Sequence, residues 1–156
     1  YNTGKPRYEL VPLGMLGMSL LAGAETSEAV AACKALIELG KFQERDPSPG
    51  CSLYSAMEAL GLEGGWDECA QVFDYGQRKY AAWNWAKGMA WSVPLACAAR
   101  HLLAIIRGEH IDVDKPGAPG SKLPHRGHVF CNLVMLITYL RTFPEGDDRP
   151  AAGLLA

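Results

Sequence analysis

Two segments of this sequence, 93–106 and 129–140, are apolar around the whole circumference of a helix. Because such a helix must be covered on all sides, both segments are expected at the centre of a helical bundle. No stretch alternates apolar and polar residues for long enough to require a sheet, and nothing repeats at a fixed period. The sequence therefore predicts an all-α fold, a helical bundle.

The 156 residues suffice for one domain built around one core. Caps, apolar periodicity and Gly or Pro stops predict helices at 13–21, 27–40 after a Thr26 or Ser27 cap, 52–60, 67–79 with Asp67 as cap, 92–107 and 125–141. We expect a structured aromatic loop at 79–91, a Pro-rich loop at 113–124 and a mobile tail over 145–156. We treat 1–156 as a single all-α domain.

Charge and composition exclude several classes of partner and environment. A net charge of −2 and no run of Lys and Arg argue against nucleic-acid binding. No stretch reaches the roughly 20 uninterrupted apolar residues that a membrane span requires. The 5 cysteines are odd in number and widely spaced, which favours buried thiols in a reducing compartment over a disulfide framework. We therefore expect a soluble protein of the cytoplasm.

The polar residues of the two apolar segments are the first candidates for chemistry. Arg100 and His101 interrupt one segment, and Asn132 interrupts the other. A polar group at the centre of a bundle needs a partner, so these side chains are expected to converge. His125, His128 and Asn132 follow at helical spacing and share one face of the last helix. The alternative for the histidines is a structural role, as hydrogen-bonded core or exposed residues.

Two acidic residues follow the first of these segments. If the helix continues through Gly108, Glu109 and Asp112 point the same way and form a carboxylate pair near the imidazoles. If Gly108 ends the helix, charged residues at such positions are more commonly solvated. Carboxylates suit hard cations such as Mg²⁺, while imidazole carries protons or donates to phosphate. The mixed set suits phosphate-ester chemistry.

Several short motifs occur together, in order, along the chain. They are Gly4-Lys5-Pro6-Arg7-Tyr8 with Leu10 and Pro12, Tyr75-Gly76 with Lys79-Tyr80, Asn84-Trp85 with Lys87-Gly88, Arg100-His101-Leu102, Arg107-Gly108-Glu109 with Asp112, and Leu123-Pro124-His125 with His128 and Asn132. In these pieces the chain resembles the N-terminal domain of phage dATP/dGTP diphosphohydrolases, which are related in logic to the MazG-like all-α nucleotide pyrophosphohydrolases. The pieces cover the opening arm and roughly residues 66 to 141.

The resemblance implies metal-dependent hydrolysis of a purine deoxynucleoside triphosphate, a small-molecule nucleotide, to the monophosphate and pyrophosphate. The implied cofactor is Mg²⁺ or Mn²⁺, held by Glu109 and Asp112, with catalytic roles for His101, His125 and His128. The remaining candidates bind substrate: Lys79 and Arg100 the phosphates, Trp83 or Trp85 the base by stacking, and with them Asn84 and Asn132. It also implies a homo-oligomer, acting in the cytoplasm of an infected host cell.

The sequence departs from the family pattern at two places. Arg78 stands where the family usually has an acidic residue, and Asp67 to Gln71 only partly repeat a metal-binding EExxE helix because Gln71 lacks the last carboxylate. Residues 14–65 form an expected insertion, suited to an oligomer or partner surface. These departures motivate an alternative reading: a catalytically inactive descendant that serves as a structural or binding protein, with a virion partner and location.

Overall fold

The computed structural model describes residues 4–155, and they form the all-α fold that the sequence predicts. Six α-helices lie within this range: α1 Leu13–Leu21, α2 Ser27–Gln43, α3 Pro49–Leu60, α4 Leu62–Lys79, α5 Ser92–Ile106 and α6 His125–Thr142. Short 3₁₀ turns occupy Tyr8–Leu10, Asn84–Lys87 and Pro144–Gly146. The described residues contain no strand, only two isolated β-bridges.

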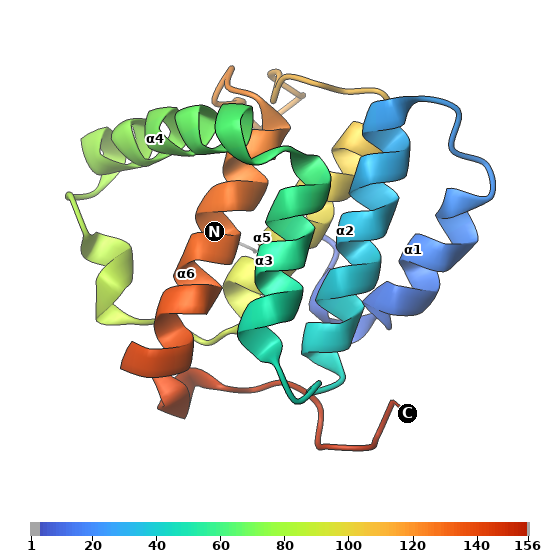
Figure 1. Ribbon diagram of the computed structural model, residues 1–156. Helices are drawn as coiled ribbons and strands as arrows, with labels where there is room; N and C mark the ends of the chain where they lie inside the picture. The colour runs from blue at the N-terminus through green and yellow to red at the C-terminus, as the bar shows by residue number, and fades with distance from the viewer. Residues whose placement is uncertain (1–3, 156) are drawn as a thin grey trace.

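The helices α2, α3, α5 and α6 stand side by side, α1 packs outside α2, and α4 lies across one end of α6 (Figure 1). Helices α5 and α6 lie against each other at the centre, as their apolar circumference requires. Their largest fully buried side chains include Leu102, Phe130, Leu133, Leu136 and Tyr139. Helix α2 packs into the same core through Leu36, Leu39 and Phe42, so the expected insertion shares one core with the rest of the chain.

Glycines bring α1 and α2 into unusually close contact. A Cβ added to Gly40 would lie 2.4 Å from the backbone nitrogen of Gly14, and one added to Gly17 would lie 2.8 Å from the carbonyl oxygen of Cys33. The prediction that Gly40 ends the second helix was wrong, because α2 continues to Gln43 and Gly40 instead makes room for α1. The same contact explains why α1 forms over residues 13–21 despite its glycines.

The amide of Gln43 anchors the opening arm. This buried side chain accepts a hydrogen bond from the backbone nitrogen of Leu13, at the start of α1, at 2.9 Å. It donates to the carbonyl oxygens of Val11 at 2.8 Å and Glu9 at 3.2 Å. The extended arm and the first turn of α1 are thereby fixed to the end of α2, since these backbone groups have no regular helical partner.

The boundaries of α3 and α4 differ from the predictions. Helix α3 begins at Pro49 rather than Ser52, and α4 begins at Leu62, so Asp67 lies inside α4 and does not cap it. Gly61, with φ 96°, ends α3 and starts α4 without an intervening loop. Gly65 is tolerated inside α4 because the ring of Phe130 occupies the space that a Cβ would take, with ring carbons within 2.6 Å of that position.

The tail from Glu145 was expected to be mobile, but its first part packs on the bundle. Arg149 donates to the carbonyl oxygen of Phe42 and lies over the rings of Phe42 and Trp91 at 4.5 and 5.0 Å. Asp147 bridges Arg149 and Arg45. Burial raises its pKa, but hydrogen bonds from the side chain and backbone of Arg149, together with the charges of both guanidinium groups, lower it to about 2. The cationic side chains therefore fasten the tail to the core.

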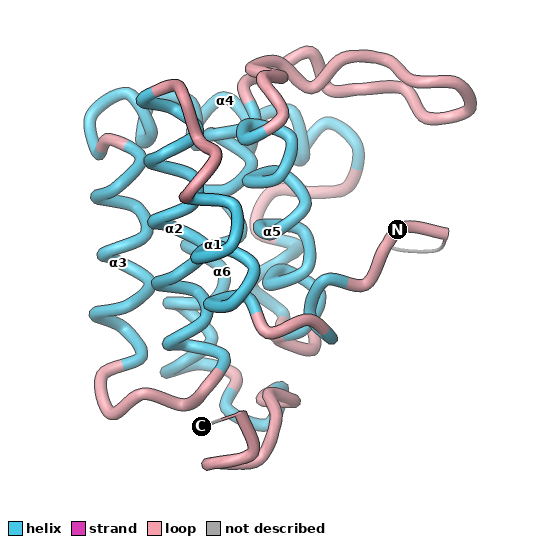
Figure 2. The backbone as a smooth tube through the Cα atoms, turned by 90° about the vertical axis from the view of Figure 1, so that its right-hand side faces the viewer, coloured by secondary structure: helices cyan, strands magenta, loops and turns pink. Residues whose placement is uncertain are grey.

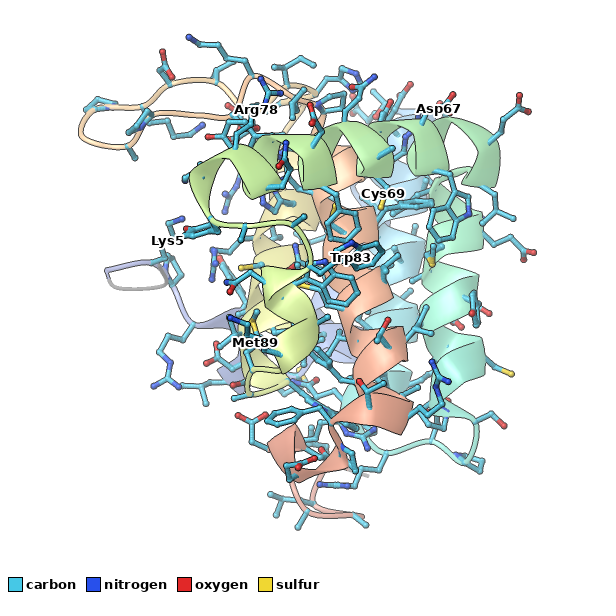
Figure 3. The ribbon with its side chains drawn as sticks, turned by 90° about the vertical axis from the view of Figure 1, so that its left-hand side faces the viewer. Lys5, Asp67, Cys69, Arg78, Trp83 and Met89 are labelled. Atoms are coloured by element: carbon cyan, nitrogen blue, oxygen red, sulfur yellow. The ribbon has the colours of Figure 1, made fainter. Side chains whose placement is uncertain are left out.

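The cysteines are free thiols, as predicted, and Cys33, Cys69 and Cys131 are buried, whereas Cys51 is exposed. The Sγ atoms of Cys69 on α4 and Cys131 on α6 lie 3.7 Å apart. Figure 3 shows Cys69 in the first half of α4 and Arg78 near its other end. No helix formed by residues 4–155 has the length and hydropathy needed to cross a bilayer.

Candidate active site

A hairpin loop between α5 and α6 positions the acidic candidates. Helix α5 ends before Gly108, whose φ of 92° suits glycine, so the helix does not continue to Asp112. The chain then leaves the bundle as a hairpin (Figure 2), with Asp112 and Leu123 paired through N–H···O at 2.9 Å. Its base is closed by the backbone nitrogen of His125, which donates to the carbonyl oxygen of His110 at 2.9 Å.

Three of the chain's four histidines meet where this hairpin joins the helices. The Nδ1 atoms of His101 on α5 and His125 on α6 lie 2.8 Å apart. The ring of His128 stacks on that of His101 with centroids 4.4 Å apart and planes within 6°. The predicted convergence of His101, His125 and His128 is therefore present. We call these three residues the histidine cluster.

Both acidic candidates reach the histidine cluster, although by a hairpin rather than by a continued helix. Glu109 Oε2 lies 3.0 Å from His125 Nε2, and its other oxygen accepts from Lys115 Nζ at 2.7 Å. Asp112 Oδ2 accepts from the backbone nitrogen and the hydroxyl of Ser121, both at 3.0 Å. The same hydroxyl lies 2.6 Å from His128 Nε2, with Asp112 Oδ2 at 3.7 Å.

Burial and neighbouring charges lower the pKa values of two members of the histidine cluster, His101 and His128. The pKa of His101 lies well below its usual range, chiefly through burial, and further through the other two imidazoles, Arg100 and Lys5. Burial also lowers the pKa of His128, against the opposing attraction of Asp112. The pKa of Glu109 is lowered, mainly by its hydrogen bond from Lys115, so this carboxylate is ionised near neutral pH. Near neutral pH, the uncharged imidazoles of His101 and His128 therefore share one cluster with an ionised carboxylate.

The two carboxylates do not fit a preformed site for Mg²⁺ or Mn²⁺. Glu109 and Asp112 each bind a different histidine, and among residues 4–155 no group of three or more His, Cys, Asp or Glu side chains is arranged to hold a metal ion. Glu109 is further engaged by Lys115. A hard cation requires several oxygens directed at one point, and these oxygens are directed at imidazole and ammonium groups instead.

The phosphate and amide candidates on the central helices flank the histidine cluster. Arg100 precedes His101 and donates to the carbonyl oxygen of Pro6 at 3.4 Å and to Cys97 Sγ at 3.1 Å. Asn132 lies one turn after His128 and donates to its carbonyl oxygen at 2.8 Å. Lys5, from the arm, adds a second positive charge close enough to lower the pKa of His101.

The aromatic-loop candidates lie elsewhere on α6. Trp85 packs between Phe73 and Tyr139, with ring centroids at 5.4 and 6.4 Å, and Trp83 tilts against it at 6.0 Å. Tyr139 follows His128 by eleven residues, a rise of roughly 16 Å along the helix. Trp83 is 72% exposed, and Figure 3 shows it on the surface below α4.

Two further substrate candidates accompany this loop. Asn84 is exposed at the start of the turn Asn84–Lys87, and the Lys79 ammonium lies over the rings of Tyr75 and Tyr80 at 5.6 and 5.7 Å. None of the interactions described for residues 4–155 joins Lys79, Trp83, Asn84 or Trp85 to the histidine cluster. The predicted substrate-binding residues thus occupy two separate regions of one chain, one beside the histidine cluster and one at the aromatic loop.

Arg78, the residue that departs from the family pattern, does not enter the histidine cluster. Its guanidinium binds Asp74 one turn earlier on α4 at 2.8 Å, and both side chains are exposed. Glu68 of the partial acidic helix binds Arg126 through two hydrogen bonds of 2.8 Å, while Asp67 and Gln71 are exposed. Two acidic side chains of α4, Glu68 and Asp74, are therefore paired with arginines.

Sequence reasoning missed two members of this site. Ser121 connects Asp112 with His128, but a serine in a Pro-rich loop carries no signal until the hairpin is formed. Lys5 lies within the Gly4 to Tyr8 motif, and that motif was the available signal, although no role was assigned to the lysine.

Comparison with known proteins assigns the family. The sequence matches the family described as dATP/dGTP diphosphohydrolase, N-terminal, over residues 57–149, which is more than half of the chain. The chain belongs to this family. The match begins in α3 and includes the whole histidine cluster with its hairpin. No curated protein and no solved structure matches the chain.

Proposed function

We propose that the chain hydrolyses purine deoxynucleoside triphosphates to the monophosphate and pyrophosphate. The observation that carries the proposal is the histidine cluster: the imidazoles of His101 and His128, whose pKa values are lowered by burial, lie with the ionised carboxylate of Glu109, and Lys5 and Arg100 supply positive charge. Imidazole nitrogens can accept a proton from water, and the cations suit phosphate oxygens. The family's description names this substrate class, and the matched segment contains the cluster.

In this proposal, separate residues of the chain bind the phosphates, orient the water and stack on the base. Arg100 and Lys5 bind the phosphates, and Asn132 with the histidine cluster orients the water and the α-phosphate. Trp83 or Trp85 stacks on a base, which requires a substrate that reaches along α6 or a base site completed by a second copy of the chain. The second possibility accords with the homo-oligomer that we propose, because the two regions lie roughly 16 Å apart along one helix. A strictly monomeric size-exclusion profile would oppose it.

Product analysis tests the proposed function. The purified chain is incubated with each deoxynucleoside triphosphate, without divalent metal and with Mg²⁺ or Mn²⁺, and the products are separated by anion-exchange chromatography. We expect monophosphate and pyrophosphate in equal amounts, greatest with dATP or dGTP. Glu109→Gln should reduce the rate, while His110→Gln changes an exposed histidine outside the cluster and serves as the matched control. Nucleoside diphosphate as the product, or no turnover of any triphosphate, would refute the proposal.

One observation favours a second function, that of an inactive descendant acting as a binding or virion structural protein. Glu109 and Asp112 are engaged by Lys115, Ser121 and two imidazoles rather than directed at one cation. The metal arm of the same experiment separates the two readings. Turnover that requires Mg²⁺ or Mn²⁺ would show that the carboxylates rearrange when metal and nucleotide bind, whereas absence of turnover in every arm favours the descendant.

A further inference from the structure

Two cysteines from different helices meet where α4 crosses α6. Cys69 lies in the first half of α4 (Figure 3), and Cys131 lies on α6, 62 positions later in the sequence. Their Sγ atoms are 3.7 Å apart, and both residues are only 3% exposed. The Cys131 thiol also donates to the carbonyl oxygen of Cys69 at 3.3 Å. The two sulfurs are therefore in contact inside the core.

Glycines bring the two helices close enough for this contact. On each helix a glycine precedes the cysteine by four residues, Gly65 before Cys69 and Gly127 before Cys131. Residues four apart lie on one face of a helix, so each glycine faces the partner helix together with its cysteine. A Cβ on Gly127 would lie 2.7 Å from the carbonyl oxygen of Glu68, and an aromatic ring of α6 occupies the place of a Cβ on Gly65. The close approach of the helices therefore places the thiols.

An ion pair beside the thiols fixes the register of the crossing. Arg126 donates to both carboxylate oxygens of Glu68 at 2.8 Å, and to the carbonyl oxygen of Leu60 at 3.1 Å. Because α4 cannot slide along α6 without breaking these bonds, the two sulfurs stay opposite each other. A disulfide requires them to approach to about 2 Å, which moves each sulfur by less than about 1 Å from its present position.

The two thiols differ in reactivity. The hydrogen bond from Cys131 lowers the pKa of the Cys69 thiol against the opposing effect of burial, whereas burial raises the pKa of Cys131. The thiolate is the form that oxidants attack, so oxidation begins at Cys69 with a second thiol already in contact. Asp67, Ala70 and Gln71 around Cys69 are exposed, so the pair lies beneath one turn of α4. An oxidant little larger than water reaches it through a local opening of that turn.

We propose that Cys69 and Cys131 are an oxidation site at which hydrogen peroxide converts the two thiols into a disulfide that links α4 to α6. The Cys69 sulfur bonds to one oxygen of the peroxide, the O–O bond breaks, and the other oxygen leaves as water with the proton of Cys69. The Cys131 sulfur then bonds to the Cys69 sulfur of the resulting sulfenic acid. The S–O bond breaks, and hydroxide leaves as water with the proton of Cys131. Two thiols lose two electrons and two protons, and the peroxide becomes two molecules of water.

The disulfide fastens α4 to the part of α6 that carries His128 and Asn132, because Cys131 lies between these two residues in the sequence. A link between residues 62 positions apart restricts the unfolded chain strongly, so oxidation stabilises the fold. The reaction needs no nucleotide, and its test is therefore separate from that of the proposed function.

Peptide mapping of the folded chain tests the linkage. The wild-type chain is treated with hydrogen peroxide in native buffer at increasing dose until Cys51, the exposed thiol, is oxidised. The remaining thiols are alkylated after denaturation, and the unreduced peptides are identified by mass spectrometry. We expect Cys69 and Cys131 in one linked pair, with Cys33 alkylated. Alkylated Cys69 and Cys131 beside oxidised Cys51, linkage of either to another cysteine, or linkage that forms only in urea would overturn the proposal.

Thermal unfolding measures the effect of the linkage. The oxidised chain should unfold roughly 5–15 °C above the reduced chain, and dithiothreitol should reverse the shift. Cys69→Ala and Cys131→Ala should each abolish the shift, and either variant suffices if the other does not fold by circular dichroism. Cys33→Ala removes a buried thiol of α2, outside the crossing, and should retain the shift. An unchanged midpoint in the linked chain, or a shift that survives in the Cys69 or Cys131 variant, would show that the disulfide does not fasten α4 to α6.

Discussion

The crossing of α1 over α2 offers a stability test in which two glycines a short distance apart should respond with opposite signs. A Cβ added to Gly40 meets the backbone nitrogen and Cα of Gly14 at 2.4 and 2.6 Å, and backbone atoms cannot rotate away. Helix α1 would have to retreat by roughly 1 Å to restore normal contact. Such overpacking costs about 1–3 kcal/mol, part of which the better helix propensity of alanine offsets, by at most ~1 kcal/mol.

Gly14→Ala is the matched control, because its added Cβ meets nothing nearer than the Cα of Gly40 at 3.8 Å. We expect Gly14→Ala to be neutral or to stabilise by a few tenths of a kcal/mol, and Gly40→Ala to destabilise by roughly 1–2 kcal/mol. Urea unfolding followed by circular dichroism measures both at constant m value. Equal stabilities, or a greater loss in Gly14→Ala, would refute the close packing and the integration of the first two helices into the bundle.

Three further measurements probe the core and the site. The pKa values of His101 and His128 are lowered in the folded state, so the unfolded chain binds more protons below about pH 6.5. The free energy of unfolding should therefore be greatest above about pH 6.5 and decline below it by up to ~1.4 kcal/mol per pH unit per histidine. Unfolding midpoints that do not change between pH 7.5 and 5.5 would contradict this prediction. Arg126→Met removes the partly buried ion pair with Glu68 and should lower the free energy of unfolding by about 1–3 kcal/mol, whereas Arg78→Met removes an exposed pair and should lower it by less than about 0.5 kcal/mol. Similar losses for the two variants in thermal unfolding would refute the distinction. Gln43→Ala leaves the backbone groups of the arm and of the start of α1 without hydrogen-bond partners, and it should lower the free energy of unfolding by about 2–4 kcal/mol and expose the arm to proteolysis. An undiminished unfolding midpoint would contradict the anchoring role of Gln43.

The sequence predicts best those helices whose bounds depend only on the local pattern of apolar residues, Pro and Gly. Helices α5 and α6 were predicted to within a residue or so, because all-round apolarity, Pro and Gly define them locally. The errors at Gly40 and at the start of α4 share another cause. In both places glycine serves a contact with a distant segment, Gly14 in one case and Phe130 in the other, and local pattern carries no information about that contact.

The candidate site shows the same contrast between what the local pattern predicts and what depends on contacts with distant segments. Helical spacing sufficed to bring His125 and His128 to one face, and the burial of α5 sufficed to direct His101 toward them. The acidic residues reached the cluster through a hairpin whose backbone pairing is not visible in composition, so the continued-helix argument gave the wrong path. Family resemblance supplied Glu109 and Asp112 where periodicity could not.

The energetics of the histidine cluster bear on whether the chain is an enzyme or an inactive descendant. A desolvated imidazole pair adds little to stability, and apolar residues of similar size that replace both partners can be neutral or stabilising. A descendant without catalysis would gain nothing by keeping such a pair. We therefore expect the double variant His101→Leu, His125→Leu to lose turnover while its free energy of unfolding stays within about 1 kcal/mol of wild type. A loss above about 2 kcal/mol would show that the pair is needed to hold α5 on α6, and a structural role would then explain its presence without any reaction.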